Sequence, residues 1–103
     1  MTLTVFLSIL SRLFGKSYAV WHEGSFDSAR ECAEYHFKKH GSEVEAADID
    51  QYIRKADTFR ANLKGARKVK LGHGTVSGAF RYYKNRKYID IAPDGRVISF
   101  GSQ

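Results

Sequence analysis

The sequence predicts an α+β fold in which N-terminal helices pack on a C-terminal antiparallel β-meander of three to four strands. Apolar residues recur every three to four positions up to about residue 66 and every second position from residue 67 onward, so the period changes from helix to strand. Short turn signals separate the predicted strands, which favours antiparallel pairing. The 103 residues suffice for one domain. We expect a single domain over 1–103, with an N-terminal helix and connector (1–24), a helical part (25–66) and a sheet (67–103).

The first helix is predicted over residues 3–14, because Leu3, Phe6, Leu7, Leu10, Leu13 and Phe14 follow helical spacing. The apolar run over 3–10 also suits a secretory signal, but no basic residue precedes it, which favours an amphipathic helix or a remnant of a longer parent chain. No stretch approaches the ~20 apolar residues that span a bilayer. We therefore expect no membrane span.

Two further helices precede the sheet. The second is expected to begin near Ser25 or Asp27, either of which can cap a helix N-terminus, and to end at Gly41. The third is expected to begin at Asp48, which has capping-box spacing to Gln51. Its apolar positions repeat at three- and four-residue intervals, and Gly65 is its expected end.

Strands are predicted over 69–71, 79–83, 88–92 and 96–100, with turns at 84–86 and 92–95. In the last hairpin, a two-residue loop would pair Ile89 with Ile98 and Tyr88 with Ser99, and would gather the apolar residues on one face. A three-residue loop with a bulge at Gly95 would scramble that segregation. The sequence therefore favours the two-residue loop.

Charge divides the chain into unlike halves. Residues 1–53 carry 5 basic and 8 acidic residues, whereas residues 54–103 carry 12 basic and 3 acidic residues, so the halves have net charges of −3 and +9. Tyrosines are interleaved with the cations of the second half. A basic surface with aromatic rings attracts nucleic acid, although a solvated charged face is the simpler alternative. The candidate nucleic-acid contacts are Arg67, Lys68, Lys84, Arg86, Lys87, Tyr83 and Tyr88.

His36 and His40 are the strongest candidates for chemistry, because they lie one turn apart on the second helix and a histidine is the usual general acid or base near neutral pH. They can equally be structural histidines at the edge of the core. Cys32 adds two weaker alternatives: a metal ladder with the two histidines, completed by His22 or His73, and a thiol nucleophile. The single cysteine excludes a disulfide within the chain. We expect no metal and no cofactor.

Several short motifs occur in a suggestive order. They are His36-Phe37-Lys38-Lys39-His40-Gly41, a periodic helix with Tyr52, Ala56 and Phe59, then Phe80-Arg81-Tyr82-Tyr83, Tyr88, and Pro93-Asp94-Gly95 followed by Ser99-Phe100. This order resembles small ribonuclease toxin domains of the barnase–EndoU–colicin–RelE group, which often form the C-terminal domain of polymorphic and contact-dependent inhibition toxins. The resemblance spans about residues 29–100.

The resemblance implies a catalytic set carried over by position. It makes His40 the first candidate and His36 the second, and it adds Arg81, Ser99, Lys70 and Tyr82. Arg81 and Tyr82 are adjacent on a predicted strand, so their side chains should leave opposite faces, and Arg81 is the better candidate of the two.

The implied function is a metal-independent endoribonuclease toxin that cleaves RNA by attack of the 2′-hydroxyl. Histidine would transfer protons, and arginine and lysine would stabilise the phosphate. The implied partners are RNA (tRNA or another species) and an acidic immunity protein or antitoxin, with action in the cytoplasm, either as a free-standing protein or after delivery by a toxin system. Two alternatives remain: a non-catalytic basic RNA- or DNA-binding module, and an interaction domain that uses its first helix.

Overall fold

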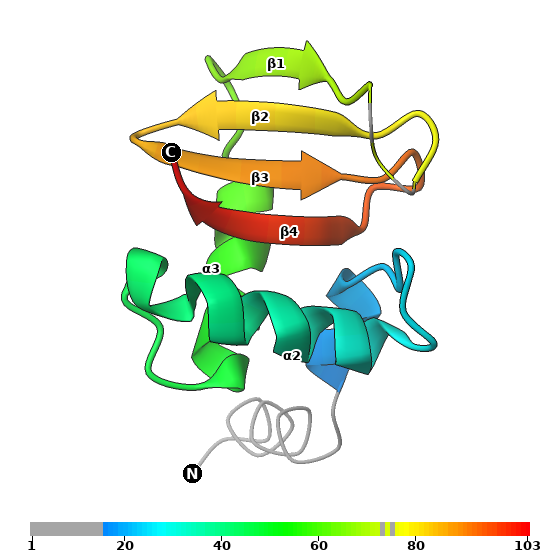
Figure 1. The fold of residues 1–103 in the computed structure, drawn as a ribbon. Coiled ribbons are helices and arrows are strands. Elements are labelled where there is room, and N and C mark those ends of the chain that lie inside the picture. The colour runs from blue at the N-terminus through cyan, green and yellow to red at the C-terminus, as the bar shows by residue number, and fades with distance from the viewer. Residues whose placement is uncertain (1–15, 73, 75) are drawn as a thin grey trace, which may run out of the picture.

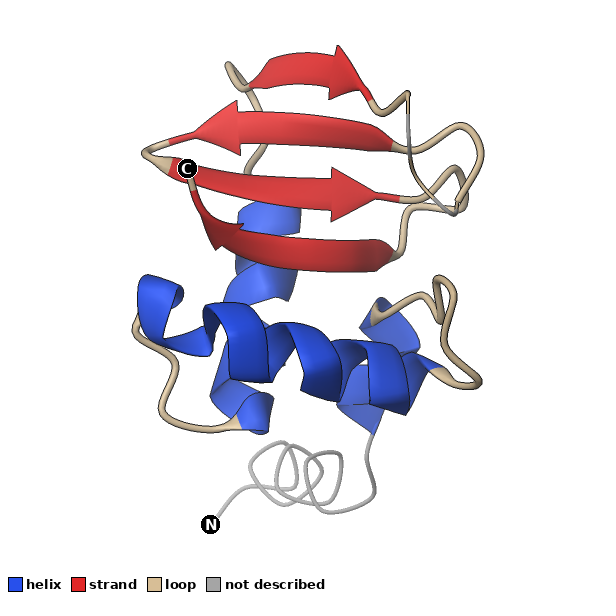
Figure 2. Ribbon diagram, in the orientation of Figure 1, coloured by secondary structure: helices blue, strands red, loops and turns tan. Residues whose placement is uncertain are grey.

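The computed structural model describes residues 16–72, 74 and 76–103. The predicted first helix and its signal-peptide alternative lie outside these residues, as does His73. In chain order the elements are the 3₁₀ helix η1 (Lys16–Val20), α2 (Ala29–His40), the 3₁₀ helix η2 (Gly41–Val44), α3 (Ile49–Ala61), β1 (Arg67–Lys70), β2 (Phe80–Lys84), β3 (Lys87–Ile91) and β4 (Val97–Ser102). Helices followed by a four-stranded antiparallel sheet confirm the predicted α+β class (Figures 1 and 2).

Helix α2 begins later than predicted. Ser28 is its N-cap, and the Ser28 hydroxyl accepts a hydrogen bond from the amide of Glu31. The residues before it form a tight turn instead, in which the Phe26 amide donates to the Glu23 carbonyl. Gly24 supports this turn with a φ of 58°, a left-handed conformation that glycine adopts without strain. Ser25 and Asp27 therefore lie outside the helix.

The α-helix ends at His40 with Gly41 as its C-cap, as predicted, but the chain does not reverse direction at Gly41. Its backbone is right-handed helical (φ −57°, ψ −43°), and the chain continues directly from α2 into η2. The reversal comes four residues later at Glu45, whose φ of 58° is left-handed and whose amide closes back on Gly41 and Ser42. A side chain at Gly41 would also collide with the ring of Phe37. This continuation places Glu43 one helical turn beyond His40.

Helix α3 begins as predicted. Asp48 is the N-cap and its carboxylate accepts a hydrogen bond from the Gln51 amide at 2.8 Å. The Gln51 side chain reaches back to the Ala47 amide, so both orphan donors are satisfied. The helix ends at Ala61, four residues before the expected Gly65.

The sheet has the order β1-β2-β3-β4, and cross-strand partners share a face. One face packs on the helices through Ile89 and its partner Phe100. In Figure 1, α3 passes behind the sheet, and no described helix lies over β1–β3 on the other side, which we call the outer face. Two rows of partners cross this outer face: Val69, Arg81, Asp90 and Ser99 in one, and Arg67, Tyr83, Tyr88 and Gly101 in the other.

The register of the last hairpin differs from the prediction. Ile89 pairs with Phe100 and Asp90 with Ser99, rather than Ile89 with Ile98. The loop holds three residues, because the Ala92 amide donates to the Arg96 carbonyl and Gly95 takes a φ of 90°. A register shift next to Asp90 restores the segregation of apolar from polar side chains. The predicted two-residue loop is therefore wrong. The preceding hairpin has the predicted turn, in which Asn85 and Arg86 both have positive φ.

The core lies between the helices and the inner face of the sheet. Its largest fully buried side chains are Trp21, Tyr52, Phe100, Ile53 and Ile89. Three aromatic rings pack in a row at tilted angles: Trp21 in the connector after η1, Tyr52 on α3 and Phe100 on β4. The connector itself is held by a parallel bridge between Trp21 and Val97. Within the described part of the chain, no helix combines the length and apolarity needed to cross a membrane.

Candidate active site

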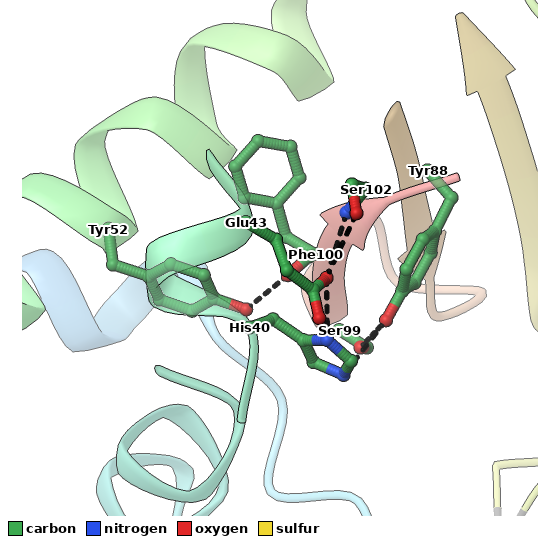
Figure 3. A network of polar contacts seen from close by, with 7 residues as sticks. All are labelled: His40, Glu43, Tyr52, Tyr88, Ser99, Phe100 and Ser102. Atoms are coloured by element: carbon green, nitrogen blue, oxygen red, sulfur yellow. Dashed lines mark hydrogen bonds and ion pairs between the residues drawn. The ribbon is translucent and has the colours of Figure 1, made fainter. Parts of the chain in front are cut away.

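His40, the last residue of α2, stands at the centre of a polar network at the edge of the sheet (Figure 3). Its Nδ1 lies 3.0 Å from Oε1 of Glu43, and its Nε2 lies 3.1 Å from the hydroxyl of Tyr88. The Tyr88 hydroxyl is in turn 2.8 Å from Oγ of Ser99. The network thus joins α2 and η2 to β3 and β4, and about 15 % of the His40 side chain remains exposed.

Glu43 fixes the tautomer of the imidazole. Partial burial works against ionisation of this carboxyl, but hydrogen bonds from the Ser102 amide and from His40 outweigh it, so its pKa is lowered. An ionised carboxylate can only accept, so Nδ1 of His40 carries the proton. In this tautomer Nε2 carries no proton and is an acceptor, so the Tyr88 hydroxyl is the group that can donate to it. This orients a proton acceptor toward β3, in the manner of a base held by a carboxylate.

Gly101 permits this arrangement. It pairs with Tyr88 across the sheet, so any side chain here would project from the outer face beside the tyrosine. A Cβ at this position would lie 2.8 Å from Oε1 of Glu43, 2.9 Å from a ring carbon of Tyr88 and 3.0 Å from Nδ1 of His40. The three site residues therefore meet in the space that glycine leaves empty.

Gly101→Ala should consequently disrupt the network. The new methyl group would press on Oε1 of Glu43 and Nδ1 of His40 as well as on the Tyr88 ring. Overpacking of this kind costs about 1–3 kcal/mol. We expect a stability loss in that range, measured by urea unfolding, together with loss of the His40–Glu43 contact, measured as a shift of the His40 ring resonances in NMR. Gly65→Ala is the matched control, because a Cβ there meets nothing within 4 Å, although its φ of 84° adds strain. Unchanged His40 resonances in Gly101→Ala would contradict this account.

Arg81 contacts the network through Tyr88, and its charge is already paired with a carboxylate. Its Nε and Nη2 donate to the two carboxylate oxygens of Asp90 at 2.7 and 2.9 Å. The same guanidinium lies over the ring of Tyr88, 4.1 Å from its centroid. Because Asp90 is only 6 % exposed, the bidentate pair compensates a buried carboxylate and holds Tyr88 by a cation–π contact.

His36 stacks on His40 but makes no polar contact in the network. The two rings are nearly parallel (9°) with centroids 5.9 Å apart, and Nδ1 of His36 is buried without a hydrogen-bond partner among the described residues. Burial, followed by the neighbouring His40 and Lys39, lowers the pKa of His36 from 6.5 to about 4. His36 is therefore neutral near pH 7 and acts as a packing partner of His40.

This depressed pKa predicts a pH dependence of stability. Between about pH 4 and 6.5 the unfolded chain binds the proton of His36 more readily than the folded chain does, so stability rises with pH across this window and levels off above it. His36→Phe keeps a ring in place but removes the titration. We expect its urea midpoint to vary less with pH over this range than that of the parent. Parallel curves for the two proteins would show that His36 is not the source.

Of the other predicted catalytic residues, Ser99 lies at the site, whereas Tyr82 and Lys70 lie elsewhere on the sheet. Ser99 belongs to the network, but it is 5 % exposed and bonded to Tyr88. Tyr82 points to the inner face, opposite Ile89, as strand alternation requires. Lys70 is exposed on β1, three strands from β4, and pairs with Phe80 at the far end of β2. Neither Tyr82 nor Lys70 is brought to His40.

The predicted nucleic-acid contacts also fall on both faces. On the outer face, the Arg67 guanidinium lies 4.3 Å from the centroid of Tyr83, and Tyr88 belongs to the site. On the inner face, Lys68 lies over the ring of Phe80. Arg86 occupies the β2–β3 turn. Lys84 and Lys87 flank this turn, and the Lys84 ammonium donates to the Asn62 carbonyl.

The alternatives that used Cys32 gain no support from the surroundings of this residue. The thiol is buried, its Sγ lies 3.7 Å from the Ile98 carbonyl, and burial raises its pKa. Reactive cysteines have lowered pKa values and accessible sulfurs, so these are features of a structural thiol. In the described ranges, no three His, Cys, Asp or Glu side chains are grouped so that they could hold a metal ion.

Three residues of the site were not among those predicted from the sequence: Glu43, Asp90 and Gly101. Only Glu43 left a usable signal, an acid one helical turn after a candidate histidine. No protein family, curated protein or solved structure matches the chain. The geometry of the site offers an imidazole and a phenol suited to proton transfer, with the Arg81 guanidinium beside the phenol ring.

Proposed function

We propose that this protein is an endoribonuclease of the toxin type, which cleaves RNA by attack of the 2′-hydroxyl on the adjacent phosphate. The observation that carries the proposal is the position of His40 between the Glu43 carboxylate and the Tyr88 hydroxyl. A carboxylate on one ring nitrogen leaves the other nitrogen ready to accept a proton. RNA supplies the nucleophile, so the protein needs a base, an acid and positive charge.

In the proposed reaction, Nε2 of His40 takes the proton of the 2′-hydroxyl as the 2′-oxygen forms a bond to phosphorus. The bond between phosphorus and the 5′-oxygen then breaks, and the imidazolium returns the proton to that oxygen. The products are a 2′,3′-cyclic phosphate and a 5′-hydroxyl end. Glu43 stabilises the imidazolium while it exists, and the Tyr88 hydroxyl, released from Nε2 by the substrate, donates to a phosphate oxygen.

Charge supports an RNA substrate as well. The segment that carries the sheet, residues 54–103, has a net charge of +9. Such a surface binds the phosphate backbone and adds to the rate of encounter. Because a free nuclease of this kind would damage its own cell, we also propose an acidic immunity protein or antitoxin as a partner, with action in the cytoplasm.

The test is incubation of the purified chain with total RNA in excess EDTA, followed by sequencing and chemical analysis of the ends. We expect cleavage that persists under chelation and leaves 2′,3′-cyclic phosphate ends. Cleavage that requires added metal, or ends that carry a 3′-hydroxyl, would contradict the mechanism. Growth arrest on expression, relieved in His40→Ala, would support the toxin assignment.

A second function, a non-catalytic RNA- or DNA-binding module, is favoured by one observation. The Arg67–Tyr83 pair on the outer face combines a cation with a ring on which a base can stack. Under this alternative, RNA would bind in a salt-sensitive manner and remain intact. The EDTA experiment separates the two functions directly.

A further inference from the structure

A groove of about 640 Å³ lies on the helix side of the sheet, at the end where β2 turns into β3. Its walls come from η2, α3 and the β2–β3 turn, and Glu43 is one of its lining residues. Since Glu43 also bonds His40, the groove begins where the catalytic network ends. The volume is that of a site for a small ligand or a short piece of chain.

The groove is lined by more cations than anions. Its charged residues are Arg54, Lys55, Lys84 and Lys87, together with Glu43 and Glu45. The carboxylate of Glu43 already accepts from the Ser102 amide and from His40. None of the four cations has a carboxylate partner among the described residues. The groove thus keeps a net positive charge available to an anion.

Two of these ammonium groups are held in place before any ligand arrives. Lys55 Nζ donates to the carbonyls of Val44 and Glu45 at 3.0 and 3.2 Å, so one of its three donors is left over. Lys84 Nζ donates to the Asn62 carbonyl at 2.6 Å. Carbonyl partners fix the side chains without neutralising them. A ligand anion therefore meets ordered charges and does not have to order two flexible lysines.

The apolar lining between these charges comes from Val44, Phe59 and Phe100, of which Phe59 is partly exposed and the other two are buried. Cations around one partly exposed aromatic ring, that of Phe59, suit a single-stranded nucleic acid, whose phosphates and bases alternate along the chain.

We propose that this groove binds the single-stranded RNA that flanks the cleaved phosphate, with Arg54, Lys55, Lys84 and Lys87 as its phosphate contacts. The proposal rests on the proposed function for the identity of the chain. The RNA would pass from the outer face, around the end of the sheet beside Ser102, into the groove. Arg54 and Lys55 come from α3, so the binding surface extends beyond the sheet.

The test measures binding of a short single-stranded 2′-O-methyl RNA, which has the charge of RNA but no attacking hydroxyl. The groove variant is Arg54→Gln/Lys87→Gln, which leaves the two fixed lysines intact. The matched control is Lys38→Gln/Lys64→Gln, which removes the same charge from exposed positions that do not line the groove. Thermal unfolding checks both variants, and the single variant Arg54→Gln, at an exposed position, tests the groove if the double variant is unfolded.

We expect the groove variant to bind about tenfold more weakly and its salt dependence to fall by about 1.4 in slope, since each phosphate contact on a single strand contributes about 0.7. The control should change affinity by about twofold or less. Equal losses in the two variants would overturn the proposal. Equal weakening toward polyglutamate of the same charge would also overturn it, because the groove would then recognise an acidic protein. Cleavage of unmodified RNA is scored separately, so absence of cleavage with groove-dependent binding would sink the ribonuclease proposal alone.

Discussion

His40→Ala is expected to lower the rate of RNA cleavage by a factor on the order of 10²–10⁴, which is the usual contribution of a positioned general acid or base. The reason is specific to the site. Tyr88 would keep its hydrogen bond to Ser99 but lose the acceptor at Nε2 of residue 40. Glu43 would keep its hydrogen bond from the Ser102 amide but lose the imidazole that it orients. No other described side chain bonds both residues. The measurement is single-turnover cleavage of a defined RNA.

Binding provides the internal control for this prediction. The affinity for 2′-O-methyl RNA should change little in His40→Ala, because the cations of the surface supply most of it. Lys39→Ala is the matched variant, since its exposed side chain is the neighbour of His40 on the same helix and lies over Tyr35 rather than in the network. A His40→Ala protein that folds, binds and cleaves at the parental rate would remove the basis for an enzyme.

Local signals in the sequence predicted most of the fold. Asp48 and Gln51 fix the start of α3 through contacts within one turn of helix, so their spacing sufficed. The Asn85-Arg86 turn is equally local. The register of β3 with β4 is not a local feature. The three-residue loop and the bulge at Ile98, opposite the step from Asp90 to Ile91, compensate each other, and alternation alone cannot place both. His40 was predicted as a catalytic candidate from its residue type and its place on the helix. Ser99 was predicted only from the family resemblance.

The remainder of the site depends on contacts that no local pattern encodes. Gly41 caps α2, as its residue type predicts, but no local pattern predicts that η2 follows directly and brings Glu43 to His40. The role of Tyr88 depends on the end of α2 reaching over Gly101, two segments far apart in the sequence. Arg81 was predicted as a phosphate ligand, whereas in the fold its charge is already engaged by Asp90. Such pairings arise only when the register and the packing are known.

Arg81→Met should be among the most destabilising single substitutions at the site. The substitution removes the cation that pairs with the Asp90 carboxylate, a residue that is only 6 % exposed. It also removes the cation–π contact with the ring of Tyr88. Breaking a fully buried pair costs about 3–5 kcal/mol, and since about a third of the Arg81 side chain reaches solvent, we expect about 2–3 kcal/mol by urea unfolding. A loss below about 0.5 kcal/mol would show that Asp90 finds other partners or is protonated without penalty.

The double variant Arg81→Met/Asp90→Val then separates support from catalysis. Replacing both partners leaves no buried charge, and valine suits a strand, so most of the lost stability should return, whereas additive losses would contradict a coupled pair. Cleavage by this refolded double variant decides what Arg81 does. If the guanidinium only compensates Asp90, activity returns together with stability. If it also reaches the phosphate through its remaining donors, stability returns and cleavage stays low, because methionine offers nothing to a developing negative charge.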